Sequence, residues 1–129
     1  MWTRRQRQMC IRDRSSAIGY ETWIRMSTRP RDWHRDHDDR LEMTTGELKY
    51  PICTTCYYPY VADDVKDGRL CFENGTIVLP KTNRMVFFGP DVYHNVEPFT
   101  GERISILLNP WNESLCQTPC HDPWRRYMV

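Results

Sequence analysis

The sequence predicts an all-β core folded as a jelly roll, also called a double-stranded β-helix. Short runs rich in β-branched and aromatic residues follow one another between residues 20 and 110, with proline- and glycine-containing turns between them. No segment of that range has the apolar spacing of a helix, which argues against alternating strands and helices. Such strands form a sandwich, a barrel or a jelly roll. The jelly roll is favoured because it brings residues of distant strands to one mouth.

Turn-forming residues separate the expected strands. Arg29-Pro30 ends the first strand, and Pro51 and Pro59 bound the third. Asn74-Gly75 predicts a hairpin with a primed turn, whose twist matches that of its strands. The expected strands are residues 20–27, a short strand ending near His34, and residues 52–58, 70–73, 76–79, 85–88, 94–96 and 103–108.

A dense polar cluster follows the second expected strand, where residues 33–39 hold two histidines and three aspartates. Residues two apart on a strand face the same side, so His34 and Asp36 can both reach one metal ion while Arg35 turns away. The third ligand has to come from a distant segment, and His94 is the candidate because it lies in an apolar, β-prone stretch. Two histidines and one carboxylate are typical of non-haem iron(II) with open coordination positions.

Other interpretations of these residues stay open. His37 and Asp39 form a second His-x-Asp pair, which is an alternative register for the same site. Histidines on strands are also commonly structural residues that form hydrogen bonds without binding metal.

The cysteines suggest a second kind of metal site. Cys53 and Cys56, with Cys116 and Cys120, have the spacing of a zinc module. Against this, residues 53 and 56 lie in a strand-like run, where residues three apart face opposite sides. Outside the first fourteen residues the chain has five cysteines, an odd number that favours reduced thiols and therefore a cytoplasmic protein.

The first fourteen residues are expected to be foreign to the protein and disordered. Residues 4–14 resemble the in-frame translation of a sequencing-library adapter, and a basic arm or a transit peptide is the alternative. The domain is then residues 15–112, truncated at its N-terminus, and residues 113–129 form a C-terminal tail. Removing the five arginines and one aspartate of residues 1–14 from 18 basic and 17 acidic residues leaves 13 and 16, a net charge of −3. We therefore expect no nucleic-acid partner. No apolar run is long enough to predict a membrane span.

Several segments, in order, resemble the 2-oxoglutarate- and iron(II)-dependent oxygenases, in particular the prolyl 4-hydroxylase-like branch. Together they cover roughly residues 20–112. One departure is Asp67-Gly68, where the family usually has Gly-Gly. The matching segments are residues 33–36, 54–58, 67–70, 80–88 and 94–105.

The resemblance assigns roles residue by residue. It implies that His34, Asp36 and His94 bind Fe(II), and that Arg103 binds the distal carboxylate of 2-oxoglutarate. Arg103 and Ser105 are two apart on one strand and should face inward together, where a guanidinium beside a hydroxyl suits a carboxylate. Tyr58 would reach the same carboxylate, although a one-residue slip would put Tyr57 in its place.

The function implied is a dioxygenase that hydroxylates a small-molecule or peptide substrate and converts 2-oxoglutarate to succinate. Peptidyl proline is the default substrate of this branch, oxygen is the co-substrate, and ascorbate is an additional cofactor. The truncation predicts a fragment that is poorly soluble or inactive, with an apolar sheet face exposed. The alternative is a non-catalytic, cupin-like metal-binding module, and a zinc-ribbon module built on the cysteines is a third hypothesis.

Overall fold

The structure is a computed structural model that describes residues 17–113 and 115. The predictions for residues 1–14, for most of the tail and for Cys116 and Cys120 lie outside the described residues. The described chain is mostly β-strand with one short helix, which confirms the all-β class. The elements are β1 (Gly19–Arg25), β2 (Arg31–His34), α2 (Asp39–Thr45), β3 (Thr54–Val61), β4 (Lys66–Asp67), β5 (Leu70–Phe72), β6 (Ile77–Val78), β7 (Arg84–Phe88), β8 (His94–Val96), β9 (Phe99–Thr100) and β10 (Arg103–Trp111).

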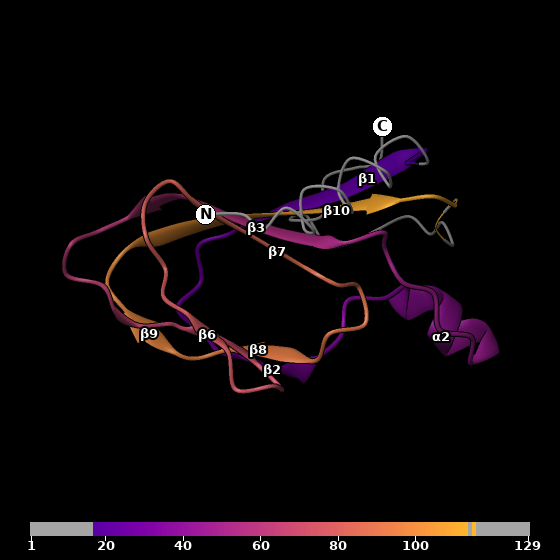
Figure 1. Cartoon of the computed structure of the whole chain (residues 1–129), viewed down its shortest axis with the longest axis horizontal. Coiled ribbons are helices and arrows are strands. Elements are labelled where there is room, and N and C mark those ends of the chain that lie inside the picture. Colours follow the sequence, from indigo (N-terminus) through magenta and orange to yellow (C-terminus); the bar gives the residue numbers. More distant parts are fainter. Residues whose placement is uncertain (1–16, 114, 116–129) are drawn as a thin grey trace.

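Two four-stranded antiparallel sheets form two layers (Figure 1). The first has the strand order β1-β10-β3-β7 and the second has the order β2-β8-β5-β6. Strands β4 and β9 form a separate two-stranded pair. Apart from the β5–β6 hairpin, neighbouring strands within each sheet are not consecutive in sequence, so the chain crosses repeatedly from one layer to the other. Residues from both layers therefore meet in the space between them.

β10 is an inner strand of the first sheet and carries a row of inward-facing side chains. It pairs with β1 from Gly19–Trp111 to Arg25–Ser105, and with β3 on its other side. Alternate residues of a strand face the same side, which turns Arg103 and Ser105 toward the second sheet. Both are buried and line a cavity between the two sheets.

β8 brings the two predicted histidine ligands together in the second sheet. His94 pairs with His34 of β2 on one side and with Phe72 of β5 on the other. Residues directly paired on antiparallel strands point to the same face. The strand register therefore places the two imidazole rings side by side, although sixty residues separate them in the sequence.

The β5–β6 hairpin forms as predicted, but with a different turn. The Gly75 N–H donates to the Phe72 carbonyl, and the Phe72 N–H donates to the Thr76 carbonyl. Gly75 has a φ of 85°, whereas Asn74 is not among the residues with positive φ. This pattern is a three-residue loop ending in a left-handed glycine, so the predicted two-residue primed turn is wrong.

The expected end of the third strand at Pro59 is also wrong, because β3 continues to Val61. The register against β10 shifts here, since Ile104 pairs with Tyr60 but Ile106 pairs with Tyr57. Two residues of β3 thus face one of β10. Proline is tolerated in a strand at such a bulge, where the ladder is already interrupted.

Helix α2 contradicts the expectation that no helix occurs between residues 20 and 110. Its apolar spacing is weak, and none of its residues is buried. Its ends are well defined instead: the Asp38 side chain accepts from the Leu41 N–H, and Gly46 closes the helix with a φ of 73°. Capping rather than amphipathic packing therefore explains this short helix.

The apolar core lies between the sheets and includes Tyr58, Leu70 and Phe72. The opposite face of the first sheet is apolar but open to solvent, because Ile24, Met85 and Leu108 are exposed there. Within the described part of the chain, no helix has the length and apolar character needed to cross a bilayer.

Candidate metal centre

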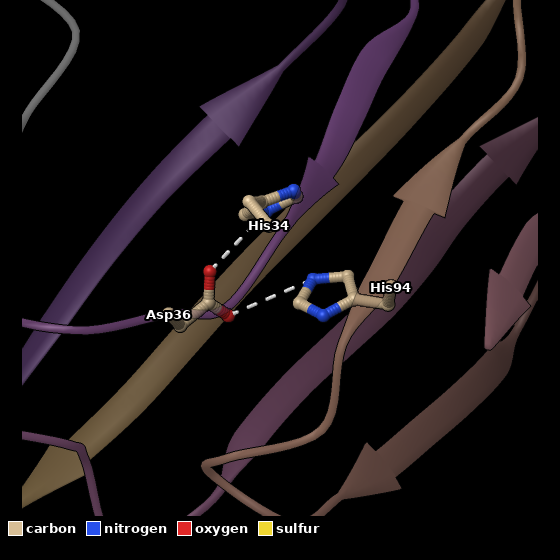
Figure 2. Close-up of side chains that lie close together, drawn as sticks. All are labelled: His34, Asp36 and His94. Atoms are coloured by element: carbon tan, nitrogen blue, oxygen red, sulfur yellow. Dashed lines mark ion pairs between the residues drawn. The ribbon is translucent and has the colours of Figure 1, made fainter. Parts of the chain in front are cut away.

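The structure brings the three predicted metal ligands together. His34 ends β2, Asp36 follows it, and His94 begins β8, so that all three side chains converge between the sheets (Figure 2). The His34 Nε2 lies 3.5 Å from one Asp36 oxygen, and the His94 Nε2 lies 4.0 Å from the other. One donor atom of each residue lies within 4.8 Å of the others. Arg35 turns away, as predicted, and its Nε donates to the Asp91 carbonyl at 2.8 Å.

Both histidines are oriented in the same way by the backbone. The His34 Nδ1 lies 2.7 Å from the Asp32 carbonyl, and the His94 Nδ1 lies 2.9 Å from the Val92 carbonyl. A carbonyl only accepts, so each Nδ1 carries a proton, and in the neutral form of each ring the lone pair is on Nε2. Metal-binding histidines usually have such a partner, because it fixes both tautomer and ring orientation.

Asp36 is a buried carboxylate with several stabilising neighbours. The Thr54 hydroxyl donates to its Oδ2 at 2.9 Å, and Thr54 itself is 0% exposed. Burial alone would raise the pKa of Asp36, but the proximity of His34 and His94 and the hydrogen bond from Thr54 together lower it. The carboxylate form that a cation needs is therefore retained.

His94 lies deepest of the two histidine ligands. The centre of its ring lies 4.7 Å from that of Phe88, which it meets edge-on, and 6.3 Å from that of Phe72. Burial in these apolar surroundings lowers the pKa of His94, although Asp36 opposes the shift. A neutral imidazole is the form that coordinates a metal ion.

These residues fit a divalent transition metal. Donor atoms bound to one such ion at about 2.0–2.2 Å lie no more than about 4.4 Å apart, and the 4.8 Å that encloses one donor atom of each residue is close to that span. Two imidazoles and one carboxylate also match the donors that suit iron(II) with open positions. His34, Asp36 and His94 would hold the ion, and the other residues of the described chain that line the cavity include no carboxylate.

Arg103 lines the same cavity and is enclosed by aromatic rings. It is 3% exposed, and its guanidinium carbon lies 3.9 Å from the centre of the Phe99 ring and 5.6 Å from that of Tyr58. One guanidinium nitrogen donates to the Gly68 carbonyl at 2.7 Å. Among the described residues no carboxylate lies within 4 Å of it, and burial lowers the pKa of Arg103. A buried cation of this kind needs an anion to offset its desolvation.

The turn before β5 is shaped around Arg103. Gly68 has a φ of 71°, and a Cβ placed there would lie 2.6 Å from an Arg103 guanidinium nitrogen and 2.8 Å from the Phe99 Cβ. Glycine is therefore required at this position. Asp67 also has a positive φ, 66°, which aspartate tolerates better than most residues. This explains how Asp-Gly can replace the expected Gly-Gly.

Ser105 and Tyr58 lie where the sequence predicts them. Both are buried, and both line the cavity with Arg103. Burial raises the pKa of Tyr58, so its phenol stays protonated and can donate to an anion. The alternative Tyr57 faces the other way, with its hydroxyl donating to Asn83 at 3.1 Å.

Sequence reasoning missed Thr54 and Phe99. Thr54 supports Asp36, and Phe99 covers one face of the Arg103 guanidinium. The alternation of β3 does place Thr54 on the same face as Tyr58, four residues later, which could have indicated a role. Phe99 lies in β9, a two-residue strand outside the two four-stranded sheets. A strand this short shows no alternation of apolar and polar residues that would predict which way Phe99 faces.

The second His-x-Asp pair forms a separate group. His37, Asp39 and Glu42 place one donor atom each within 4.8 Å, but Asp39 and Glu42 are exposed. The His37 Nε2 lies 2.6 Å from Glu42 and 3.4 Å from Asp39. This pair is therefore not an alternative register of the cavity site but a local cluster at α2.

The three cysteines of the described chain, Cys53, Cys56 and Cys71, contribute to neither group. Cys56 is buried, and burial raises the pKa of its thiol, which disfavours the thiolate that zinc binds. Cys53 lies just before β3 and is half-buried. The groups able to hold a metal among residues 17–113 and 115 contain no cysteine.

The comparisons with known proteins give no further guide. No family model, no curated protein and no solved structure matches this chain. What the chain offers is a histidine–aspartate–histidine group and a buried arginine in one cavity between two sheets. Its function has to be inferred from that geometry.

Proposed function

We propose that this protein is an Fe(II)- and 2-oxoglutarate-dependent dioxygenase. The observation that carries the proposal is that the three metal-ligand candidates and Arg103 line one cavity. A metal site with a purely structural role has no need of a buried guanidinium beside it. A co-substrate with one carboxylate at the metal and another at its far end would satisfy both features at once.

The strand order supports a jelly roll as the finer description of the fold. Leaving out the short pair β4–β9, eight strands divide into two four-stranded sheets, and the chain changes sheet between most successive strands. β1, the first strand, pairs along its whole length with residues 105–111 of β10, the last strand. A double-stranded β-helix has this arrangement, and it places ligands from strands at both ends of the chain at one mouth.

In the proposed reaction, one oxygen atom of O₂ enters a substrate C–H bond as a hydroxyl group, and the other enters 2-oxoglutarate, which loses carbon dioxide to give succinate. Bound iron(II) would supply the activation of oxygen. His34, Asp36 and His94 hold the ion. Arg103, Ser105 and Tyr58 bind the distal carboxylate and fix the direction of the co-substrate in the cavity.

The test is an anaerobic titration of the protein with Fe(II) and then 2-oxoglutarate. The chelated complex is expected to give a weak visible charge-transfer band. We expect Asp36→Ala to lose the band and Arg103→Ala to require about ten to a hundred times more 2-oxoglutarate, because a hydrogen bond to a charged group contributes about 1.5–3 kcal/mol. Arg40→Ala, which removes a charge from α2, is the matched control.

The outcome separates the proposal from its alternative. Metal binding without a 2-oxoglutarate band, from protein shown to be folded by circular dichroism, would favour a cupin-like module with a structural metal. A band that is unchanged in Arg103→Ala would contradict the assignment of the co-substrate clamp.

A further inference from the structure

We propose that the molecule hydroxylated by this protein carries an oxyanion, a carboxylate or a phosphate, that binds Arg25 and Arg31 in the cavity. This inference rests on the proposed function and adds the chemical class of its substrate. It comes from two cavity residues that have no part in holding the metal or 2-oxoglutarate.

Arg25 and Arg31 lie at the two ends of one connection between the layers. Arg25 is the last residue of β1 in the first sheet, and Arg31 is the first residue of β2 in the second sheet. Arg25 pairs with Ser105, whereas Arg31 pairs with Val96. Side chains from opposite layers therefore line the same cavity, and the charge of Arg31 is near enough to act on Arg25.

One hydrogen bond orients the Arg25 guanidinium and leaves other N–H donors of the group for a ligand. One of its terminal nitrogens donates to the Arg29 carbonyl at 2.8 Å, within the connection that follows β1. A guanidinium has five N–H donors, so most of them are left for a ligand. Because the side chain is half-buried and already ordered, an anion could bind it with little further loss of conformational entropy.

The cavity is rich in positive charge and poor in negative charge. Of the described residues that line it, Asp36 is the only acidic one, against Arg25, Arg31 and Arg103. Among the described residues, no carboxylate lies within 4 Å of any of these arginines. The pKa of Arg25 is lowered, mainly by burial and then by repulsion from Arg31 and Arg103. This repulsion is expected where several cations lie close together without a neighbouring anion.

The proposed cofactors do not neutralise this cluster. A divalent ion and three arginines carry five positive charges, while Asp36 and doubly charged 2-oxoglutarate carry three negative ones. Two positive charges remain, and Arg25 and Arg31 are the two arginines of the cavity to which the proposed function assigns no anion. An uncharged substrate would leave both guanidinium groups without an anion, whereas a carboxylate or phosphate matches their planar donor geometry.

The test uses protein loaded anaerobically with Mn(II), a paramagnetic ion that replaces Fe(II), and with saturating 2-oxoglutarate. Three small probes are added separately: propionate, methyl phosphate and the uncharged propionamide. Bound Mn(II) broadens the proton resonances of any probe that enters the cavity, which detects weak binding. Propionate and methyl phosphate distinguish a carboxylate from a phosphate as the preferred oxyanion.

We expect at least one anionic probe to be broadened and propionamide not to be. Arg25→Gln and Arg31→Gln should each weaken anion binding about tenfold, because each removes charge-assisted hydrogen bonds, and Arg25→Lys should restore part of it. Arg40→Gln, on α2 and away from the cavity, should have no effect. Arg31 is exposed, so its substitution tests the inference even where Arg25→Gln disturbs folding.

Four results would overturn the inference. If anion broadening persists in both glutamine variants, the probe binds Mn(II) directly. If the variants lose 2-oxoglutarate itself, Arg25 and Arg31 belong to the co-substrate clamp. If the parent binds Mn(II) and 2-oxoglutarate but no anionic probe, this inference fails and the proposed function stands, whereas failure to bind 2-oxoglutarate at all overturns both.

Discussion

Two His-x-Asp pairs lie three residues apart in this chain, and they have different surroundings in the structure. His34 and Asp36 face the cavity and are joined by His94 from β8. His37 and Asp39 are joined by Glu42, only three residues further along. In the first group 4–21% of each side chain is exposed, against 18–54% in the second. The spacing of a motif therefore does not by itself make a metal site.

What differs is where each Nε2 points. In all three histidines Nδ1 contacts the backbone carbonyl two residues earlier. The Nε2 of His37 then forms a close ion pair with the Glu42 carboxylate, which favours a protonated ring. The Nε2 atoms of His34 and His94 face a shared carboxylate from two sides. The first arrangement stabilises a short helix at the surface, and the second leaves lone pairs for a cation.

The largest expected effect is on metal affinity. Asp36→Ala should weaken Mn(II) binding more than about a hundredfold, since even residues that only support a ligand typically contribute a factor of ten to a hundred. Asp39→Ala should leave it within about twofold. The free Mn(II) signal in electron paramagnetic resonance measures both affinities. Equal losses of Mn(II) affinity in the two variants would contradict the claim that only the His34–Asp36–His94 group binds the metal.

Thr54→Val is expected to have an intermediate effect. The substitution keeps the shape of the side chain but removes the hydroxyl that donates to Asp36, so Mn(II) binding should weaken about tenfold. Thr55→Val, on the next residue of β3 and facing the opposite side, is the control. An unchanged affinity in Thr54→Val would mean that the buried hydroxyl does not support the ligand.

The smallest expected effect is a difference between two histidine pKa values in metal-free protein. Burial lowers the pKa of His94 below the ordinary 6.5. Burial also acts to lower the pKa of His37, but Glu42, the Arg35 carbonyl and Asp39 together raise it. As the pH falls, His94 is therefore protonated at a higher pH in the unfolded chain than in the folded chain. The folded protein loses stability from this residue as the pH drops below about 6.5, and it loses none above that pH. The contribution of His37 has the opposite sign and is lost as the pH rises through its raised pKa.

Proton NMR of the ring C–H resonances, with a chelator present, measures both titrations. His37→Gln and His94→Gln assign the signals. We expect the two midpoints to lie on opposite sides of 6.5. Midpoints on the same side would show that the two rings have similar surroundings.

The sequence predicted the parts of this molecule that depend on local pattern. Alternation along the strand placed His34 and Asp36 on one side, and the same rule turned Arg103 and Ser105 inward together. The choice of Tyr58 over Tyr57 depended on register, which a slip of one residue would have reversed. The β-bulge at Pro59 shows why such a choice is uncertain before the pairing of the strands is known.

The rest depends on contacts between distant segments. Thr54 gains its role only because β3 brings its hydroxyl to Asp36, and Phe99 gains its role only because β9 brings its ring to Arg103. Arg25 and Arg31 look like ordinary strand-end cations in the sequence, and only the stacking of the two sheets shows that they share a cavity. Helix α2 was missed because its caps, rather than an apolar stripe, define it.

Anomalous X-ray scattering from crystals grown anaerobically with Mn(II) and 2-oxoglutarate tests the central claim most directly. The account predicts one manganese peak among His34, Asp36 and His94, with density for 2-oxoglutarate extending from the metal to Arg103. A peak between His37, Asp39 and Glu42, or a metal at the predicted site with no co-substrate reaching Arg103, would contradict it.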